Sequence, residues 1–392
     1  MKLFFILSLC FFTPAILFAE EPIPRDPSHV SLRNEVLLSL TKGLDWLRQQ
    51  QQADGSFANP DAPGASAEHP ALTALPLLAF QREPTGKSAT EYAELLKKGY
   101  VYLRSKVQPD GGIYGKGLSN YNTSVSLMAL LSGGEPSDEP VLEAARAFII
   151  GQQAKGMAKP ELDGGFGYGP TGASPKRQHP DLDNTLLALD ALRAYRKARP
   201  QVEVAAGKDL DWQAAIDFIT RCQNLPTHNK MEWASDDPQN KGGFVYYPGF
   251  SNAGEQELEG GKKALRSYGS MTYGGLLSFI YADLKRDDPR VAAALEWVKK
   301  NYTLEENPGM GRQGLYYYYH LLAKGLAIAQ IDELMTSDGR RVDWQRELAL
   351  RLIHLQNSDG SWVNDTARWM EKDPVLVTTY CSLTLSILYH QM

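Results

Sequence analysis

Two aspartates separated by one residue are the strongest candidates for chemistry in this 392-residue sequence. Asp181 and Asp183 lie in the run His-Pro-Asp-Leu-Asp-Asn-Thr, which opens an apolar segment with helical periodicity. Clustered carboxyls shift each other's pKa, so the pair could supply a general acid. The same positions could instead only cap the helix, because Asp and Asn accept hydrogen bonds from the free N–H groups of a first turn. Both interpretations stay open at this point.

Aromatic side chains near the starts of other apolar segments could line a cavity around such an acid. The chain holds 7 Trp, 19 Tyr and 13 Phe. We predict substrate contacts from Tyr121, Tyr268, Tyr273, Tyr317 and His320. Successive side chains of a helix point in different directions, so at most two of the four tyrosines at 316–319 should face one cavity.

The elements that must position these residues repeat along the chain. Each unit has a helix ending in Gln, a turn of the Asp-Gly-Gly/Ser type followed by a large apolar residue, and a second helix with Thr in its first turn. Glycine suits the turn because it has no Cβ. The six turns are Asp54–Phe57, Asp110–Ile113, Asp163–Phe166, Gly242–Phe244, the degenerate Pro308–Gly311, and Asp359–Trp362.

Three columns of residues align across these units. The Gln column holds Gln50, Gln108, Gln152 or Gln153, Gln223 and Gln356. The first-turn column holds Thr73, Thr123, Thr185, Thr272, Tyr317 and Thr379. Four residues later stand Leu77, Leu127, Leu189, Leu276, Leu321 and Leu383, on the same helix face. The pattern predicts an all-α fold over residues 31–392, an (α/α)6 toroid with six outer and six inner helices.

The turn motif resembles the QW repeat of squalene and oxidosqualene cyclases, which also occurs in the β subunits of protein prenyltransferases. The match runs from about residue 35 to the C-terminus; QNSDGSW at 356–362 matches fully and QQADGSF at 51–57 closely. The resemblance implies an α/α toroid whose repeats tie the outer helices together. It implies fold more strongly than activity.

The acidic run resembles the Asp-x-Asp-Asp-Thr motif with which class II cyclases of the squalene–hopene type protonate an alkene. By that resemblance Asp183 is the proton donor, Asp181 the flanking carboxyl and Thr185 the Thr, while Asn184 replaces the last Asp. Protonation of a C=C bond needs a strong acid, and the cation then forms in a dry cavity lined by aromatic rings. The resemblance implies a cyclase-like isomerase that acts on a hydrophobic isoprenoid without a cofactor.

Two other families with this toroid have sequence motifs that this chain lacks. Protein prenyltransferases bind zinc through Asp-x-Cys and a later His. Here no inner helix opens with Asp-x-Cys, and His320 stands without the other ligands, so no metal site is expected. Complement-type thioester domains need Gly-Cys-Gly-Glu-Gln, whereas Ala253 occupies the Cys position in the run at 252–256.

Two further functions stay open. A carbohydrate-active α/α barrel would use a pair of carboxylates, with Asp181, Asp183, Asp163 and Glu232 as candidates. A non-catalytic exported protein would instead hold a lipid or a peptide in the central cavity. The polarity of the cavity separates these functions, because a lipid site should be apolar with one acid and a sugar site polar with several.

The N-terminus predicts export. Lys2 precedes an apolar run that Pro14 ends, and Ala19 is the small residue expected before a cleavage site. We therefore expect residues 1–19 to be a signal peptide and residues 20–30 a disordered lead-in, with a periplasmic or secreted mature protein.

The remaining composition indicates which kinds of partner are not expected. Cys222 and Cys381 remain after cleavage, and we interpret them as buried thiols rather than a disulfide. The net charge of −5 and the lack of a Lys/Arg run give no reason to expect nucleic acid. No segment after the leader is apolar for about 18 residues, so no transmembrane segment is expected. No partner subunit is indicated.

Overall fold

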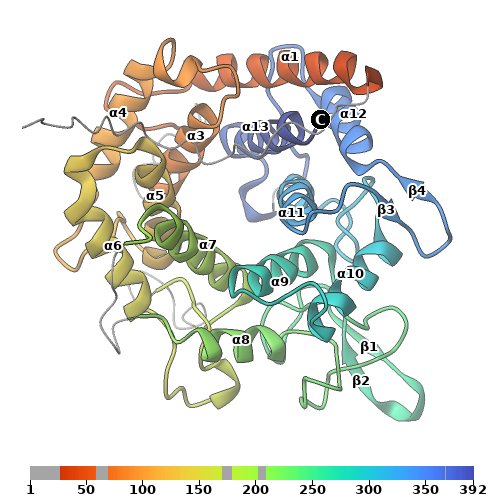
Figure 1. Cartoon of the computed structure of the whole chain (residues 1–392). Helices are drawn as coiled ribbons and strands as arrows, with labels where there is room; N and C mark the ends of the chain where they lie inside the picture. The colour runs from red at the N-terminus through yellow and green to blue at the C-terminus, as the bar shows by residue number, and fades with distance from the viewer. Residues whose placement is uncertain (1–26, 59–68, 170–178, 202–208, 367) are drawn as a thin grey trace, which may run out of the picture.

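Two concentric rings of helices form the protein (Figure 1). The computed structural model describes residues 27–58, 69–169, 179–201, 209–366 and 368–392, and in these ranges there are twelve α-helices. The outer ring consists of α1 (Pro27–Gln49), α4 (Ala93–Arg104), α6 (Glu139–Gly151), α8 (Trp212–Arg221), α10 (Pro289–Asn301) and α12 (Trp344–Leu355). The inner ring consists of α3 (Ala71–Gln81), α5 (Ser119–Gly133), α7 (Leu182–Ala198), α9 (Gly269–Tyr281), α11 (Leu315–Ile328) and α13 (Pro374–Gln391).

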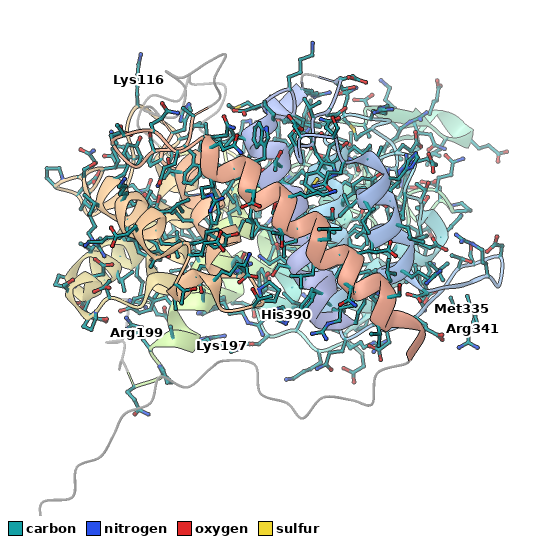
Figure 2. All side chains as sticks on the ribbon, turned by 90° about the horizontal axis from the view of Figure 1, so that it is seen from above. Lys116, Lys197, Arg199, Met335, Arg341 and His390 are labelled. Carbon is teal, nitrogen blue, oxygen red and sulfur yellow. The ribbon has the colours of Figure 1, made fainter. Side chains whose placement is uncertain are left out.

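The inner ring closes on itself. Each inner helix packs against the next, and α13 packs against α3. In Figure 2, Lys116 before α5 lies at one end of the barrel, while Lys197 in α7 and His390 in α13 lie at the opposite end. The inner helices therefore run in parallel from one end of the barrel to the other, and the predicted (α/α)6 toroid is confirmed.

Short elements fill the connections between the helices. Strands β1 (Glu255–Glu257) and β2 (Lys263–Leu265) pair antiparallel, as do β3 (Leu334–Met335) and β4 (Arg341–Val342). The 3-10 turns are η1 (Lys87–Ala89), η2 (Pro136–Asp138), η3 (Pro160–Leu162), η5 (Glu259–Gly261) and η6 (Arg368–Met370). No helix in the described ranges combines the length and apolarity needed to cross a membrane.

The chain is helical earlier than the sequence predicts. Helix α1 begins at Pro27, so residues 27–30 belong to the barrel rather than to a disordered lead-in. The predicted signal peptide, residues 1–19, lies outside the described residues. Cys222 and Cys381 are both buried free thiols.

Glutamine side chains after four outer helices tie neighbouring outer helices together. Gln356 Nε2 donates to Gly360 O in its own turn and to Ser39 O in α1, both at 2.9 Å, which links the last outer helix to the first. Gln153 and Gln223 make equivalent pairs of bonds. In the first unit this residue is Gln51 rather than the predicted Gln50.

The turn glycines are required by backbone shape and by close packing. Gly164 has φ +92°, and a Cβ there would lie 2.0 Å from Ala214 O in α8. Gly360 has φ +97°, and its Cβ would lie 2.5 Å from Lys42 O in α1. Any other residue would strain the backbone and push the next outer helix away.

The first-turn threonines hold each turn against an inner helix. The hydroxyl oxygens of Thr73, Thr123, Thr185 and Thr272 accept a hydrogen bond from the backbone N–H of the apolar residue that ends each turn. In the sixth unit Thr378 accepts from Trp362 N at 3.0 Å, while Thr379 donates to Val375 O of its own helix. The prediction of Thr379 was therefore wrong by one residue. Tyr317 does not share this role, because its side chain points into the cavity.

The second unit lacks the glutamine tie. Val107 stands four residues before Gly111, the spacing that separates Gln356 from Gly360. Gln108, predicted for the Gln column, donates instead to Lys106 O and Tyr114 O within its own turn.

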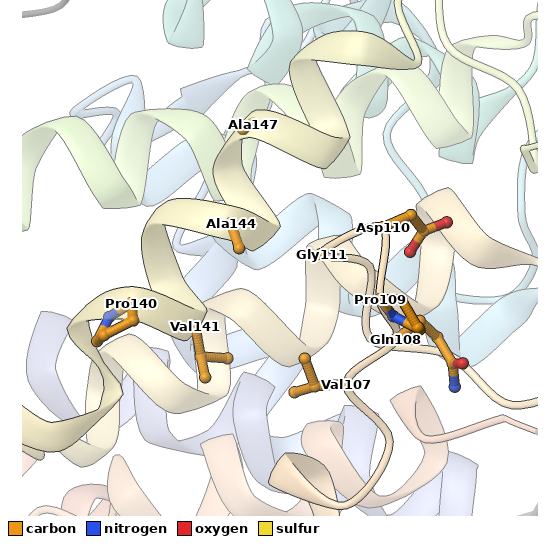
Figure 3. Close-up of a pocket in the computed structure, with 9 residues that line it drawn as sticks. All are labelled: Val107, Gln108, Pro109, Asp110, Gly111, Pro140, Val141, Ala144 and Ala147. Carbon is orange, nitrogen blue, oxygen red and sulfur yellow. The ribbon is translucent and has the colours of Figure 1, made fainter.

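A surface depression of ≈ 430 Å³ lies where the tie is missing, between this turn and α6. Val107, Val141 and Ala144 line it, and Gln108 extends away from α6 (Figure 3). We expect that an amide at position 107 could donate hydrogen bonds to the turn carbonyl and to the first turn of α6, because both border this depression.

We expect Val107→Gln to raise the free energy of unfolding by about 1 kcal/mol, because its amide can tie α6 to the turn as the other glutamines do. Val107→Met, of similar length without an amide, is the matched control. Urea unfolding measures both. A glutamine variant no more stable than the methionine variant would show that the tie adds nothing at this position.

Candidate functional site

The inner ring encloses a cavity of ≈ 630 Å³. Its walls are mainly aliphatic and come from all six inner helices: Leu72, Leu75 and Leu78, Val125 and Met128, Leu186 and Leu187, Met271 and Leu277, Leu321, and Leu376 and Leu383. Polar side chains line the cavity toward the ends. Asp183 and several tyrosines lie where the inner helices begin, and a second, charged group lies further along the helices.

Asp183 faces this cavity from the first turn of α7. Its carboxyl is partly accessible from the cavity, and the Tyr317 hydroxyl donates a hydrogen bond to its Oδ1. Burial raises the pKa of Asp183, and the bond from Tyr317 opposes this rise. Burial and the charge of Asp183 raise the pKa of Tyr317 well above its usual value, so the phenol stays a donor.

Asp181 has a different environment. It is fully buried outside the cavity lining, and it is the N-cap of α7. Its Oδ1 accepts from Asn184 N and its Oδ2 from Asn184 Nδ2, both at 2.8 Å. Burial, and then the charge of Asp183, raise the pKa of Asp181 to about 8. Asp181 is thus the cap of the helix, and the carboxyl of Asp183 faces the cavity.

Asn184, which stands in place of a third aspartate, donates hydrogen bonds to the buried carboxyl of Asp181. Asn184 is fully buried and donates both its backbone N–H and its side-chain amide to Asp181. Its own Oδ1 has no hydrogen-bond partner among the described residues. The amide of Asn184 therefore donates to Asp181 in either protonation state, whereas a carboxylate at position 184 would repel an ionised Asp181.

Four of the five predicted contact residues line the cavity: Tyr121, Tyr268, Tyr317 and His320. Tyr273 was predicted wrongly. Its ring is buried against Tyr318, with centroids 5.7 Å apart, and it packs beside Gly325 of α11. Thr272 faces the turn, and Tyr273, the next residue, points about 100° further round the helix, between α9 and α11. Within the run 316–319, Tyr317 alone lines the cavity.

Three tyrosines of the site were missed by sequence reasoning. The ring of Tyr380 lies 5.4 Å from that of Tyr317 between centroids. Tyr168 and Tyr246 approach with their hydroxyl oxygens 3.4 Å apart. Both stand two residues after the phenylalanine of their turn, so the repeat register held a signal for them. No repeat position marks Tyr380, which faces the cavity only because of its place on α13.

Glu371 also belongs to this end of the cavity and was missed. Helix α11 begins after Gly314, which has no side chain to cap it. The carboxylate of Glu371 accepts from Tyr317 N at 2.8 Å and from Asn364 Nδ2 at 2.6 Å, and burial raises its pKa. The two residues before it, Trp369 with φ 55° and Met370 with φ 64°, both have a backbone conformation that is strained for a non-glycine residue.

The carboxyls proposed for a sugar site are not brought together. Asp163 accepts from Gly156 N and Met157 N in its own loop, and Glu232 is exposed. Of the described carboxyls that line the cavity, Glu371 uses both oxygens in hydrogen bonds and Asp190 is paired with Lys324. Asp183 is left as the available acid.

His320 is held as a neutral imidazole. Burial, and then the positive charges of Lys324 and Arg82, lower its pKa well below the usual value. Its ring stacks on Tyr380, with centroids 5.9 Å apart. Within the described residues no group of three or more His, Cys, Asp or Glu side chains is placed to hold a metal ion.

The fold is similar to that of enzymes of two kinds. A variant of the type II terpene cyclase MstE from Scytonema, in complex with geranylgeranyl dihydroxybenzoate, is 13% identical over 92% of this chain and 99% of that chain, with a TM-score of 0.55. A GH76 alpha-mannanase from Bacteroides thetaiotaomicron is 12% identical over 90% of this chain and 95% of that chain, with a TM-score of 0.55. A possible GH105 family member from Salmonella enterica is 12% identical over 96% of this chain and 99% of that chain, with a TM-score of 0.56.

By sequence the chain matches no family model and no curated protein. The likeness to the solved structures shows that the chain has the α/α toroid fold of these enzymes. Terpene cyclases and glycoside-active enzymes share this fold, so the choice between their activities depends on the site.

Proposed function

We propose that the protein is a cyclase-like isomerase in which Asp183 protonates a C=C bond of a hydrophobic isoprenoid. The observation that carries the proposal is the placement of this one available carboxyl on an aliphatic, tyrosine-lined cavity. Its accessible surface faces the cavity, whereas Asp181 and Glu371 are buried and use their oxygens in hydrogen bonds.

The residues suit the proposed proton transfer. The proton of Asp183 forms the new C–H bond with the π electrons of the alkene, and the O–H electron pair stays on the carboxylate. Tyr317 donates to that carboxylate and stabilises it. The faces of Tyr121, Tyr268 and Tyr380 stabilise the carbocation. Loss of a proton after ring closure restores an alkene, so the product is an isomer of the substrate.

The polarity of the cavity supports a lipid over a sugar. Retaining and inverting glycosidases need two carboxyls on either side of one bond, and only Asp183 is available among the described lining residues. Asn184 in place of a third aspartate favours one second candidate, a protein that binds a lipid in this cavity without turnover.

Export completes the proposal. The leader pattern of residues 1–19 favours a periplasmic or secreted enzyme that starts near Glu20. N-terminal sequencing of the protein recovered outside the cytoplasm checks this, and recovery of the unprocessed chain in the cytoplasm alone would contradict it.

Product analysis tests the proposed activity. The purified mature protein is incubated with linear isoprenoids from ten carbons up to squalene, and extracts are analysed by gas chromatography with mass spectrometry. We expect a cyclic isomer from at least one of them. If none forms, while lipid extracted from the protein contains an isoprenoid, the non-catalytic binding function replaces the proposed one.

A further inference from the structure

We propose that the ligand carries an anionic group, a carboxylate or a phosphate, which binds Arg82 and Lys324 in the cavity at a distance from Asp183. This inference rests on the proposed function for the apolar part of the ligand only. The charged residues themselves have no role in the proton transfer.

The charged group lies well separated from the acid along the barrel axis. Asp190 stands seven residues after Asp183 on α7, and Lys324 seven residues after Tyr317 on α11. Two helical turns correspond to roughly 10 Å. Arg82 follows the last residue of α3, and because the inner helices run in parallel it lies on the same side of the acid. All three residues line the cavity.

The two cations act on the same part of the wall. The charges of both Lys324 and Arg82 reach His320, whose imidazole lies between Tyr380 and the charged group. Lys324 forms an ion pair with Asp190, and its ammonium lies 5.7 Å from the centroid of the Tyr281 ring. Lys324 and Asp190 are largely buried, with 17% and 14% of their side chains exposed.

The charges of this group of cavity-lining residues do not balance. Asp190 neutralises Lys324, His320 is neutral, and Arg82 makes no ion pair within the part of the chain that the structure describes. Arg82 is exposed, so one positive charge stands unpaired and accessible to a ligand where it borders the aliphatic walls of the cavity. A guanidinium also matches carboxylate and phosphate oxygens with two parallel hydrogen bonds.

The arrangement orients an amphiphile. Its anionic group would lie against Arg82 and Lys324, and its chain would pass Leu78, Leu187 and Leu321 toward the tyrosines. The double bond presented to Asp183 would then be one remote from the anionic group. A neutral hydrocarbon would lose this anchor.

Binding of matched probes tests the proposal. Isothermal titration calorimetry on the full mature protein compares farnesoic acid, farnesyl phosphate and farnesol, which share one chain and differ in the head group. We expect the tighter of the two anions to bind at least about tenfold more tightly than farnesol. The preferred anion then identifies the head group as a carboxylate or a phosphate.

Arg82→Gln should remove most of that preference and leave farnesol binding unchanged. Arg196→Gln is the matched control, because Arg196 pairs with Asp283 on the exposed surface and does not line the cavity. Equal affinity for the three probes, or an Arg82→Gln variant that keeps the full preference, would overturn the anionic site. Circular dichroism verifies that both variants fold.

The outcome is separable from that of the proposed function. Binding needs no turnover, so a protein that binds farnesoic acid through Arg82 and forms no cyclic product would refute the isomerase and support the anionic site. A protein that cyclises squalene, with no preference for an anion, would do the reverse.

Discussion

Asp183→Asn should abolish the formation of cyclic products while the protein stays folded. A neutral amide is far too weak an acid to protonate an alkene, and general acids contribute about 10²–10⁴-fold to rate, so activity should fall by at least about 10²-fold. The folded state should tolerate the change, since the asparagine oxygen can still accept the hydrogen bond from Tyr317 and the helix cap is Asp181. Initial rates of product formation by gas chromatography measure the effect.

Asp163→Asn is the matched control for this substitution. Asp163 carries the same chemical change in a loop outside the cavity, where it accepts from two backbone N–H groups. The control should keep its activity even if it loses some stability. If Asp183→Asn forms as much product as the wild type, another group donates the proton and Asp183 does not act as the acid.

The fold could be predicted from sequence because its signals are local and repeated. A turn glycine with positive φ, such as Gly164 or Gly360, recurs in every unit, and a threonine that accepts from the turn recurs in every unit except the fifth. The errors in the repeat register were shifts by one residue, at Gln51, Val107 and Thr378. Thr378 and Thr379 are neighbours in a helix and differ by about 100° in direction, which a repeat pattern alone does not resolve. Gln50 and Gln51 are neighbours of the same type just after α1, where the pattern does not decide which one makes the tie.

The site was predictable where its residues were adjacent in sequence. Asp181 and Asp183 stand in one motif, but the division between cap and cavity-facing acid depends on which carboxyl meets the N–H of Asn184. Glu371 reaches Tyr317 from 54 residues away, and no local pattern marks it. Tyr273 failed for the opposite reason, since a tyrosine at an inner-helix start looks the same whether it faces the cavity or the next helix.

Because burial raises the pKa of Asp181, we expect the folded state to lose stability as pH rises. The pKa of Asp181 is about 8 in the folded protein and 3.8 in the absence of the fold. Between these values the folded state holds a proton that the unfolded state has released, so the free energy of unfolding falls with rising pH. One such group contributes a slope of about 1.4 kcal/mol per pH unit. Stability from this group is complete below about pH 4 and is lost as pH approaches 8.

Asp181→Asn should flatten this dependence, because an amide does not titrate. The asparagine can keep both interactions with Asn184: its oxygen accepts from the backbone N–H, and its amide can donate to the unpartnered Oδ1 of Asn184 once that side chain turns over. Urea unfolding at pH 5, 6, 7 and 8 should show a shallower slope for the variant. A residual slope of the same sign is expected from Glu371, whose pKa burial also raises. Parallel curves for wild type and variant would mean that Asp181 is ionised in the folded protein, with its charge carried by the hydrogen bonds from Asn184.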